Sequence, residues 1–225
     1  MKPERNIRLS QGITTFGVGA IIGIGEESFI NQDIFKWHGG SNQHVVIDFP
    51  RLANRLNVTN FKYLKEKEYK SPGGLFRFSR FPRMLFCPSC RAMTEINHDI
   101  SKKLNGEVPK CNNYSCKGYS HKQLLPMRFI SVCENGHIDD FPWWQWAHSK
   151  NNISENGKCE TYDSLEFVTK FGVGASYASL IVRCKNCDSA RSLAGLEQKD
   201  ALKDIGFTCR AKQPWQQVSN IACEE

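Results

Sequence analysis

Ten cysteines carry most of the reactive chemistry of this 225-residue chain. The pairs Cys87-Pro-Ser-Cys90 and Cys111-x4-Cys116 are separated by 20 intervening residues. Each pair can present two thiolates on a tight turn, and two such turns complete the tetrahedron that zinc prefers. This spacing predicts one metal site formed by all four thiols. A redox-active Cys-x-x-Cys pair is disfavoured, because the alternating strands and helices that usually surround such a pair are missing.

A further turn of this kind, Cys184-Lys-Asn-Cys187, lies later in the chain and is followed by Cys209 and Cys223. We expect these four thiols to form a second metal site. The wide spacing of the last two makes this pattern less specific than the first.

A third set of ligands surrounds the stretch CENGHIDDFPWWQWAH at residues 133–148. Cys133 and His137 flank an Asn-Gly turn, and His148 is separated from Cys159 by 10 residues. Two thiolates and two imidazoles also suit zinc, so we predict a third site from these four residues. The twelve ligands then divide into three sites of four, which corresponds to about three zinc ions per chain.

The remaining residues of this stretch are expected to support the metal site. Asp139 or Asp140 is predicted to accept the second N–H of a ligating imidazole. Asp140 is also predicted to cap a helix whose first turn contains Pro142. Trp143 and Trp146 are three residues apart, and we expect them to pack in the core rather than to stack on nucleic-acid bases.

A nucleophilic pair formed by Cys133 and His137 is the catalytic alternative. Such a pair would need a positively charged neighbour, a residue that orients the imidazole and an element that stabilises an oxyanion. Asp139 or Asp140 could orient the ring, but the sequence offers no oxyanion element. We therefore predict no catalytic residues and no enzymatic activity.

Short strands with few helices are expected to position these residues. Residues 7–35 read as strands joined by glycine turns, and residues 76–86 are strand-like. Apolar residues predict a short amphipathic helix within residues 50–69, and a second helix is expected near residues 142–149. The predicted fold class is α+β, rich in small strands, with zinc-ribbon-like modules stabilised by Cys/His sites. The glycine run at residues 17–25 has neither the spacing nor the following helix of a dinucleotide-binding loop.

We expect two regions: an N-terminal strand and helix region, residues 1–86, and a cysteine-rich multi-zinc region, residues 87–225. Residues 1–132 contain 20 Lys/Arg and 10 Asp/Glu, whereas residues 133–225 contain 10 and 13. Four basic residues near the end of the first region are candidates for contacting nucleic-acid backbone: Lys70, Arg77, Arg80 and Arg83. The simpler interpretation of these charges is a solvated face.

The N-terminus does not read as a signal peptide. Its apolar middle is interrupted by glycines and threonines, and no small-residue cleavage pattern follows. No stretch is long and apolar enough to span a bilayer. Because reduced thiols fit a reducing compartment, we expect a cytoplasmic protein.

Five motifs resemble, in order, those of the DrmB family: RLSQGITTFGVGA, RFPRMLFCPSC, PMRFISVCENGHIDDFPWWQWAH, VRCKNCDSARSL and CRAKQPW. The resemblance spans nearly the whole chain, and its CxNGHxDDFPW core is specific. It implies a component of DISARM, a bacterial anti-phage defence system in which DrmB partners the helicase DrmA and the pair handles foreign DNA. It implies no enzymatic activity. The residues carried over are the cysteines and histidines above, with Asp139, Asp140, Phe141, Pro142 and Trp143.

Members of that family continue past the equivalent of Cys223, so the resemblance implies a shortened or split version. We predict a zinc-stabilised, non-catalytic subunit of a DISARM-like complex that binds DNA, a DrmA-like helicase, or both. No membrane and no small-molecule substrate are expected. The alternatives are a protein–protein scaffold without DNA contact and an accessory domain of a DNA-repair helicase.

Overall fold

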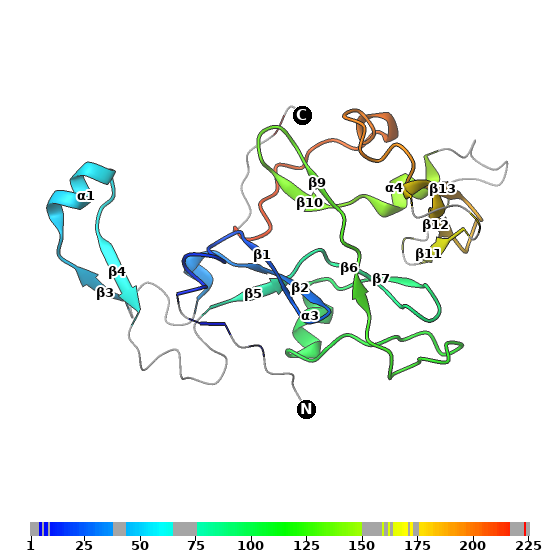
Figure 1. The fold of residues 1–225 in the computed structure, drawn as a ribbon, viewed down its shortest axis with the longest axis horizontal. Helices are drawn as coiled ribbons and strands as arrows, with labels where there is room; N and C mark the ends of the chain where they lie inside the picture. The colour runs from blue at the N-terminus through cyan, green and yellow to red at the C-terminus, as the bar shows by residue number, and fades with distance from the viewer. Residues whose placement is uncertain are drawn as a thin grey trace.

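The computed structural model describes residues 5, 7–8, 10–37, 44–64, 76–149, 159, 162, 164–170, 172, 176–216 and 223. Within these residues strands outnumber helices, and all paired strands are antiparallel. Figure 1 shows several small sheets linked by long connections rather than one large sheet. The prediction of a small-strand-rich fold with few helices is confirmed, whereas the expected division at residue 86 stays a prediction.

The N-terminal sheet has the strand order β1-β2-β5. Its strands are β1 (Ile21–Ile24), β2 (Glu27–Asn31) and β5 (Phe78–Arg80). A two-residue turn joins β1 to β2, and its first residue, Gly25, has a φ of 60°. This left-handed conformation costs glycine little, and it suits the twist of a tight hairpin. The glycine turns expected in this part of the chain are confirmed at this position.

A separate unit is formed by β3 (His44–Ile47), α1 (Pro50–Leu56) and β4 (Phe61–Leu64), in which β3 pairs with β4. The helix expected within residues 50–69 therefore covers only the beginning of that range. Asn57 ends it in a left-handed conformation with a φ of 52°, which asparagine tolerates well. In Figure 1 this unit lies at the left, apart from the other sheets.

The middle of the chain forms a second three-stranded sheet with the order β7-β6-β8. Its strands are β6 (Met84–Phe86), β7 (Met93–Glu95) and β8 (Leu125–Pro126). Helix α3 (His98–Leu104) follows β7, and the side chain of Asn97 caps it by accepting the N–H of Ile100 at 2.9 Å. The predicted strand character of residues 76–86 is confirmed, because β5 and β6 lie within it.

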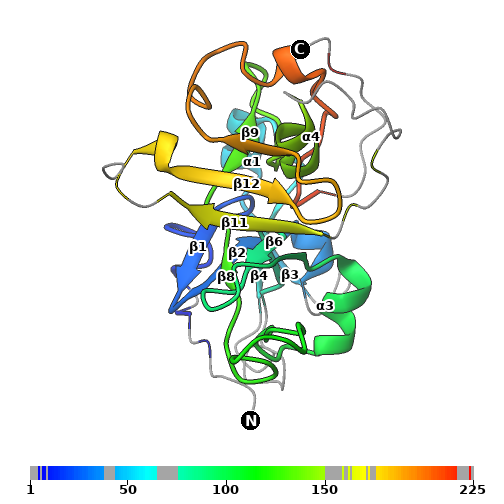
Figure 2. The same ribbon diagram turned by 90° about the vertical axis from the view of Figure 1, so that its right-hand side faces the viewer.

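The C-terminal part contains a hairpin, a short helix and a third three-stranded sheet. The hairpin pairs β9 (Ile130–Val132) with β10 (Ile138–Asp140), and α4 (Trp143–His148) follows it as expected. The sheet has the order β11-β12-β13, with the strands β11 (Leu165–Thr169), β12 (Leu180–Cys184) and β13 (Ala190–Ser192). Figure 2 shows β11 and β12 side by side across the middle of the molecule.

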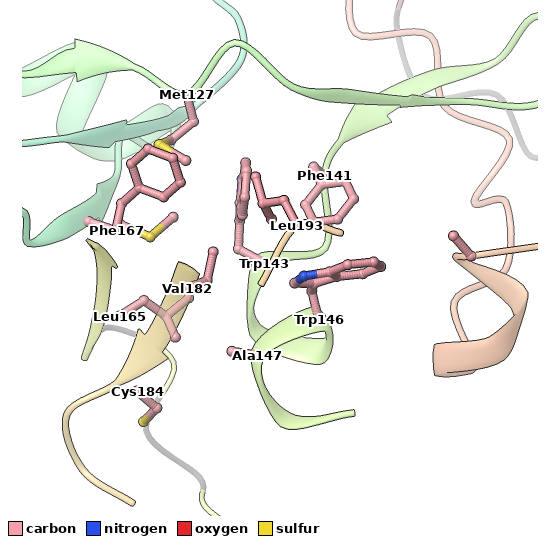
Figure 3. Packing of buried hydrophobic residues seen from close by; sticks show 12 residues of the cluster. Met127, Phe141, Trp143, Trp146, Ala147, Leu165, Phe167, Val182, Cys184 and Leu193 are labelled. Carbon is pink, nitrogen blue, oxygen red and sulfur yellow. The ribbon is translucent and has the colours of Figure 1, made fainter. Parts of the chain in front are cut away.

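Helix α4 packs its tryptophans into the larger of the hydrophobic cores. Trp143 and Trp146 are buried together with Phe141, Phe167 and Cys184, as Figure 3 shows. The expected core role of these tryptophans is confirmed. Because a thiol of the candidate metal sites lies within this core, packing and ligand placement depend on each other.

The part of the chain that the structure describes contains no helix with the length and apolar character needed to cross a bilayer.

Replacing Trp146 with alanine should lower the free energy of unfolding by about 3–5 kcal/mol, because a fully buried aromatic ring leaves a cavity. Urea unfolding followed by far-UV circular dichroism measures the change. Leu56→Ala is the control: its side chain is 55% exposed, so the loss should stay within about 0.5 kcal/mol. Equal unfolding midpoints for the parent and Trp146→Ala would contradict the core assignment.

Candidate metal centres

The twelve cysteines and histidines predicted as ligands gather into three groups of four. In each group the candidate ligand atoms all lie within 4.8 Å of one another. The first cluster is Cys87, Cys90, Cys111 and Cys116. The second cluster is Cys133, His137, Cys209 and Cys223. The third cluster is His148, Cys159, Cys184 and Cys187.

The first cluster joins two loops. The first loop follows β6, where the N–H of Arg91 donates to the carbonyl of Cys87 and so closes the turn between Cys87 and Cys90. In the second loop the N–H of Gly118 donates to Cys116 Sγ at 3.2 Å, as is usual beside a thiolate. Sulfur–sulfur distances between the loops are 3.9 Å for Cys87 and Cys116, and 3.7 Å for Cys90 and Cys111.

The second cluster lies at the tip of the β9–β10 hairpin. The N–H of Cys133 donates to the carbonyl of His137, and Gly136 has a φ of 77°, so the Asn-Gly turn brings both side chains to one point. His137 Nδ1 lies 3.3 Å from Cys133 Sγ and 3.6 Å from Cys209 Sγ. The Asn135 amide donates to Cys223 Sγ at 3.4 Å.

The third cluster lies between α4 and the end of β12. His148 Nε2 is 3.3 Å from Cys187 Sγ, and Cys159 Sγ is 3.8 Å from Cys184 Sγ. His148 Nδ1 lies 2.7 Å from the carbonyl oxygen of Trp144. A proton on Nδ1 that is donated to this carbonyl leaves Nε2 with a lone pair directed at the cluster.

Two of the three expected groupings are wrong, although the twelve residues are the predicted ones. Cys184 and Cys187 meet His148 and Cys159 rather than Cys209 and Cys223, which instead join Cys133 and His137. The prediction paired ligands that are neighbours in sequence, yet closing a longer loop costs little additional entropy.

Packing decides the actual grouping. Helix α4 contacts β12 and β13, which brings His148 to the turn after β12. The N–H of Ile138 donates to the carbonyl of Lys212, which holds the segment with Cys209 against β10. The third cluster is therefore nested in sequence between the two halves of the second.

These groups have the dimensions of tetrahedral zinc sites. Zinc–sulfur bonds of about 2.3 Å and zinc–nitrogen bonds of about 2.0 Å place two sulfurs about 3.8 Å apart, and a sulfur and a nitrogen about 3.5 Å apart. The distances given above lie within 0.3 Å of these values. They are far too long for disulfides, whose S–S bond is about 2.05 Å, and all ten thiols are free. The donor sets fit zinc in kind, number and spacing.

Protonation of the thiols differs within and between clusters. Burial raises the pKa of Cys111 to about 12 and that of Cys209 to about 11. For Cys90, burial acts in the same direction, but hydrogen bonds from the Ala92 backbone and the Asn113 side chain outweigh it and lower the pKa to about 7. A metal ion must therefore displace the protons of Cys111 and Cys209 in order to bind there.

Asp139 and Asp140 were predicted to accept the N–H of a ligating imidazole or to cap a helix. Instead, both carboxylates bind arginines. Asp140 Oδ1 accepts the backbone N–H of Arg83, and Oδ2 accepts its Nε–H, both at 2.6 Å. Asp140 thus links β10 to the start of β6. Asp139 Oδ2 accepts Arg210 Nε–H at 2.7 Å and so connects β10 to the residue that follows Cys209.

The helix cap predicted for Asp140 is wrong. Helix α4 begins after Pro142, and no side chain caps it. The ring proton of His148 faces a backbone carbonyl and not a carboxylate. Both oxygens of the Asp140 carboxylate instead accept hydrogen bonds from Arg83.

The basic residues proposed as a nucleic-acid groove also differ in their surroundings. Lys70 lies outside the described residues, and Arg77 is exposed. Arg80 is paired with the buried Glu27 and donates to the carbonyl of Glu107 at 2.9 Å. Arg83 is paired with Asp140 and Glu95. Nucleic-acid binding by this stretch stays a prediction, but two of its arginines are neutralised within the chain.

Several residues that contact the cluster ligands were not identified from the sequence. The Asn186 amide donates to Cys159 Sγ at 3.5 Å, and Asn135 does the same for Cys223. The ring of Trp144 stacks on His148 with centroids 4.3 Å apart. The asparagines inside the turns from Cys133 to His137 and from Cys184 to Cys187 were the available signal, whereas the pairing of Arg210 with Asp139 had none.

A hollow of about 100 Å³ lies beside the second cluster. Cys133, His137 and Cys209 form part of its wall, so some of this volume belongs to the metal site itself. Basic residues line the remainder: Lys199, Lys203, Arg210 and Lys212. Asp139 and Glu134 pair with three of them, so two carboxylates offset part of this positive charge.

Residues 8–225 match the sequence pattern of a family described as a domain of unknown function, DUF8724. The chain is also 27% identical over 203 residues to a protein of Bacillus paralicheniformis called DISARM protein DrmB. That similarity covers 88% of this chain and 32% of the relative. The chain thus spans about a third of the length of the curated relative that it matches.

Two double variants test the grouping of ligands. His137→Ala with Cys209→Ser removes ligands from one cluster and should lower the zinc content of the purified, reduced protein from about three ions to about two. His137→Ala with His148→Ala affects two clusters and should leave about one ion. Elemental analysis measures both. The pairing expected from sequence order gives the reverse result, so the experiment separates the two arrangements.

Zinc affinity should rise with pH. The thiols of Cys111 and Cys209, with pKa values of about 12 and about 11, hold their protons at neutral pH, so zinc binding releases them. Between pH 6.5 and 7.5, affinity should increase about tenfold for each thiol that loses its proton. Competition titrations with a chelator at the two pH values measure the change. Constant or falling affinity would contradict ligation by these thiols.

Proposed function

Because the chain belongs to the DUF8724 family and is DrmB-like, as its motifs predicted, we propose that it is a zinc-stabilised component of a DISARM-like anti-phage defence complex. The similarity to DISARM protein DrmB over 88% of the chain is the observation that carries this proposal. In this role the chain contacts a helicase of the DrmA kind, DNA, or both. Twelve metal-binding side chains suit the reducing conditions of the cytoplasm, where we place the protein.

The proposed role is structural and not catalytic. Each cluster supplies four protein ligands, which complete a tetrahedral zinc ion and leave no position for water or substrate. The carboxylates that could assist hydrolysis, Asp139 and Asp140, are occupied by Arg210 and Arg83. Zinc in such sites contributes folding energy. We assign the first cluster, with its two Cys-containing turns, to a zinc ribbon.

The surface of the unit formed by β3, α1 and β4 is evidence that the chain binds a protein partner. Among the side chains described within residues 46–60, only Ala53 is buried. Six large apolar side chains of the unit are exposed: Val46, Ile47, Phe49, Leu52, Leu56 and Val58. A two-stranded hairpin with so little core of its own is marginally stable in water. Covering these side chains with a partner contributes about 1.5–3 kcal/mol for each one that becomes fully buried.

Charges on the same unit indicate the kind of surface that fits it. Arg51, Arg55 and Lys62 are exposed, and Asp48 is the acidic residue among them. A complementary surface is apolar and bordered by carboxylates. We assign this surface to the helicase partner.

A protein–protein scaffold without DNA contact is the second candidate function. The pairing of Arg80 with Glu27 and of Arg83 with Asp140 favours it, because these guanidinium groups then have their charge balanced within the chain. The alternative of an accessory domain in a DNA-repair helicase uses the same partner surface in another pathway.

The double substitution Leu52→Asp with Leu56→Asp should abolish binding to a DrmA-like helicase, because two carboxylates replace apolar contacts in the proposed interface. Co-purification of the two proteins measures binding. In cells that carry the defence genes, the same variant should lose protection in a phage-plating assay. Zinc content should not change.

Ile13→Asp is the matched control, since Ile13 is 58% exposed and lies outside the unit. It should keep both helicase binding and protection. A parent protein that neither binds the helicase nor affects phage plating would refute the proposed function. Normal binding by the double variant would refute only the assigned surface.

A further inference from the structure

The loop that completes the first cluster exposes basic side chains, and its own sequence contains no acidic residue. Residues 108–132 contain four Lys/Arg and no Asp or Glu. Lys110, Lys117 and Lys122 are exposed, and none of the ion pairs among the described residues involves them. These lysines differ from Arg80 and Arg83, because their charge is available to a ligand.

Two tyrosines lie among these lysines. Tyr114 is 85% exposed, which is the highest value of any large apolar side chain that the structure describes. Its ring lies over that of Tyr119, with centroids 4.6 Å apart and planes inclined by 31°. One face of Tyr114 is thus supported by a second ring while most of its surface remains in water.

The cluster and backbone hydrogen bonds hold this loop in shape. Cys111 accepts the N–H of Ser120 at its carbonyl and donates its own N–H to the carbonyl of Lys122, both at 2.9 Å. A Cβ at Gly118 would lie 2.6 Å from Lys122 Cβ, so glycine is what lets the lysine stem cross the loop there. In Figures 1 and 2 the green segment after α3 lies at the lower edge of the molecule, away from α4.

We propose that the loop of residues 110–122 binds single-stranded nucleic acid, with Tyr114 stacking on a base and the three lysines contacting phosphates. A preformed aromatic ring with basic neighbours is how proteins hold unpaired bases without reading sequence. A duplex hides the faces of its bases, so it can use only the lysines. This inference rests on the DNA contact within the proposed function. It places that contact in the loop of residues 110–122 and not at the basic residues around β5.

A nucleic acid fits this loop better than a protein does. The β3–α1–β4 unit, assigned to the helicase, exposes mainly aliphatic side chains, whereas the loop exposes aromatic rings and cations. The charge balance sets the expected character of binding. Four thiolates around one zinc ion carry about −2 beneath the three lysines, so stacking rather than electrostatic attraction supplies most of the affinity.

Fluorescence anisotropy with a labelled single-stranded DNA of about 12 nucleotides, and with the corresponding duplex, tests the proposal on the zinc-loaded protein. The parent should bind the single strand more tightly than the duplex. Tyr114→Ala should weaken single-strand binding about tenfold or more, whereas Tyr114→Phe should bind like the parent, because the ring is kept. Tyr177→Ala, at another exposed tyrosine, is the control and should have no effect.

A triple variant tests the lysines. Replacing Lys110, Lys117 and Lys122 with glutamine should reduce the slope of log affinity against log salt by about 2 for a single strand. Unchanged zinc content and circular dichroism show that all variants fold.

Three results would overturn the inference: no binding of the single strand by the parent, equal binding of the duplex, or normal binding by Tyr114→Ala. In each case continued co-purification with the helicase would leave the proposed function standing. Loss of the helicase from Tyr114→Ala, without any change in DNA binding, would instead assign the loop to a protein contact.

Discussion

The gathering of twelve cysteine and histidine side chains into three groups of tetrahedral size is the constraint on which the rest of this structure depends. The sheets have two or three short strands each, and a two-stranded sheet is at best marginally stable alone. Each cluster could hold one metal ion, and its ligation by residues from separate segments would supply the missing connections. The nested second and third clusters tie the β9–β10 hairpin, α4 and the β11–β13 sheet to one another, with the tryptophans of α4 packed between them.

Internal ion pairs complete these connections and determine which charges remain available. Asp140 joins β10 to Arg83, and Asp139 joins the same strand to Arg210, so the two adjacent carboxylates hold the hairpin on both sides. Glu27 does the same for Arg80 in the N-terminal sheet. Buried or partly buried carboxylates of this kind need a partner, and the arginines that provide it are no longer free to attract a nucleic acid.

Two surfaces differ from the rest of the described molecule, and each suits a different kind of binding partner. The β3–α1–β4 unit is aliphatic and almost without a core, which suits a protein that covers it. The loop around Tyr114 is aromatic and basic, and the first cluster holds it in shape. A component that connects a helicase to a nucleic-acid strand needs one surface of each kind. No catalytic centre is required for such a role.

The sequence by itself determined which residues could be ligands, because paired thiols on tight turns and the Cys-Glu-Asn-Gly-His turn are local features. It also determined the strand-rich character and the core role of Trp143 and Trp146. Only the tertiary structure decided which ligands share an ion, since the strand pairing and helix packing that bring His148 to Cys184 leave no mark on the spacing. The pairing of Asp140 with Arg83 likewise depends on a contact between distant segments. The spacing of residues shows which ligands a single turn can present. Which turns share a metal site depends on how the turns pack against one another.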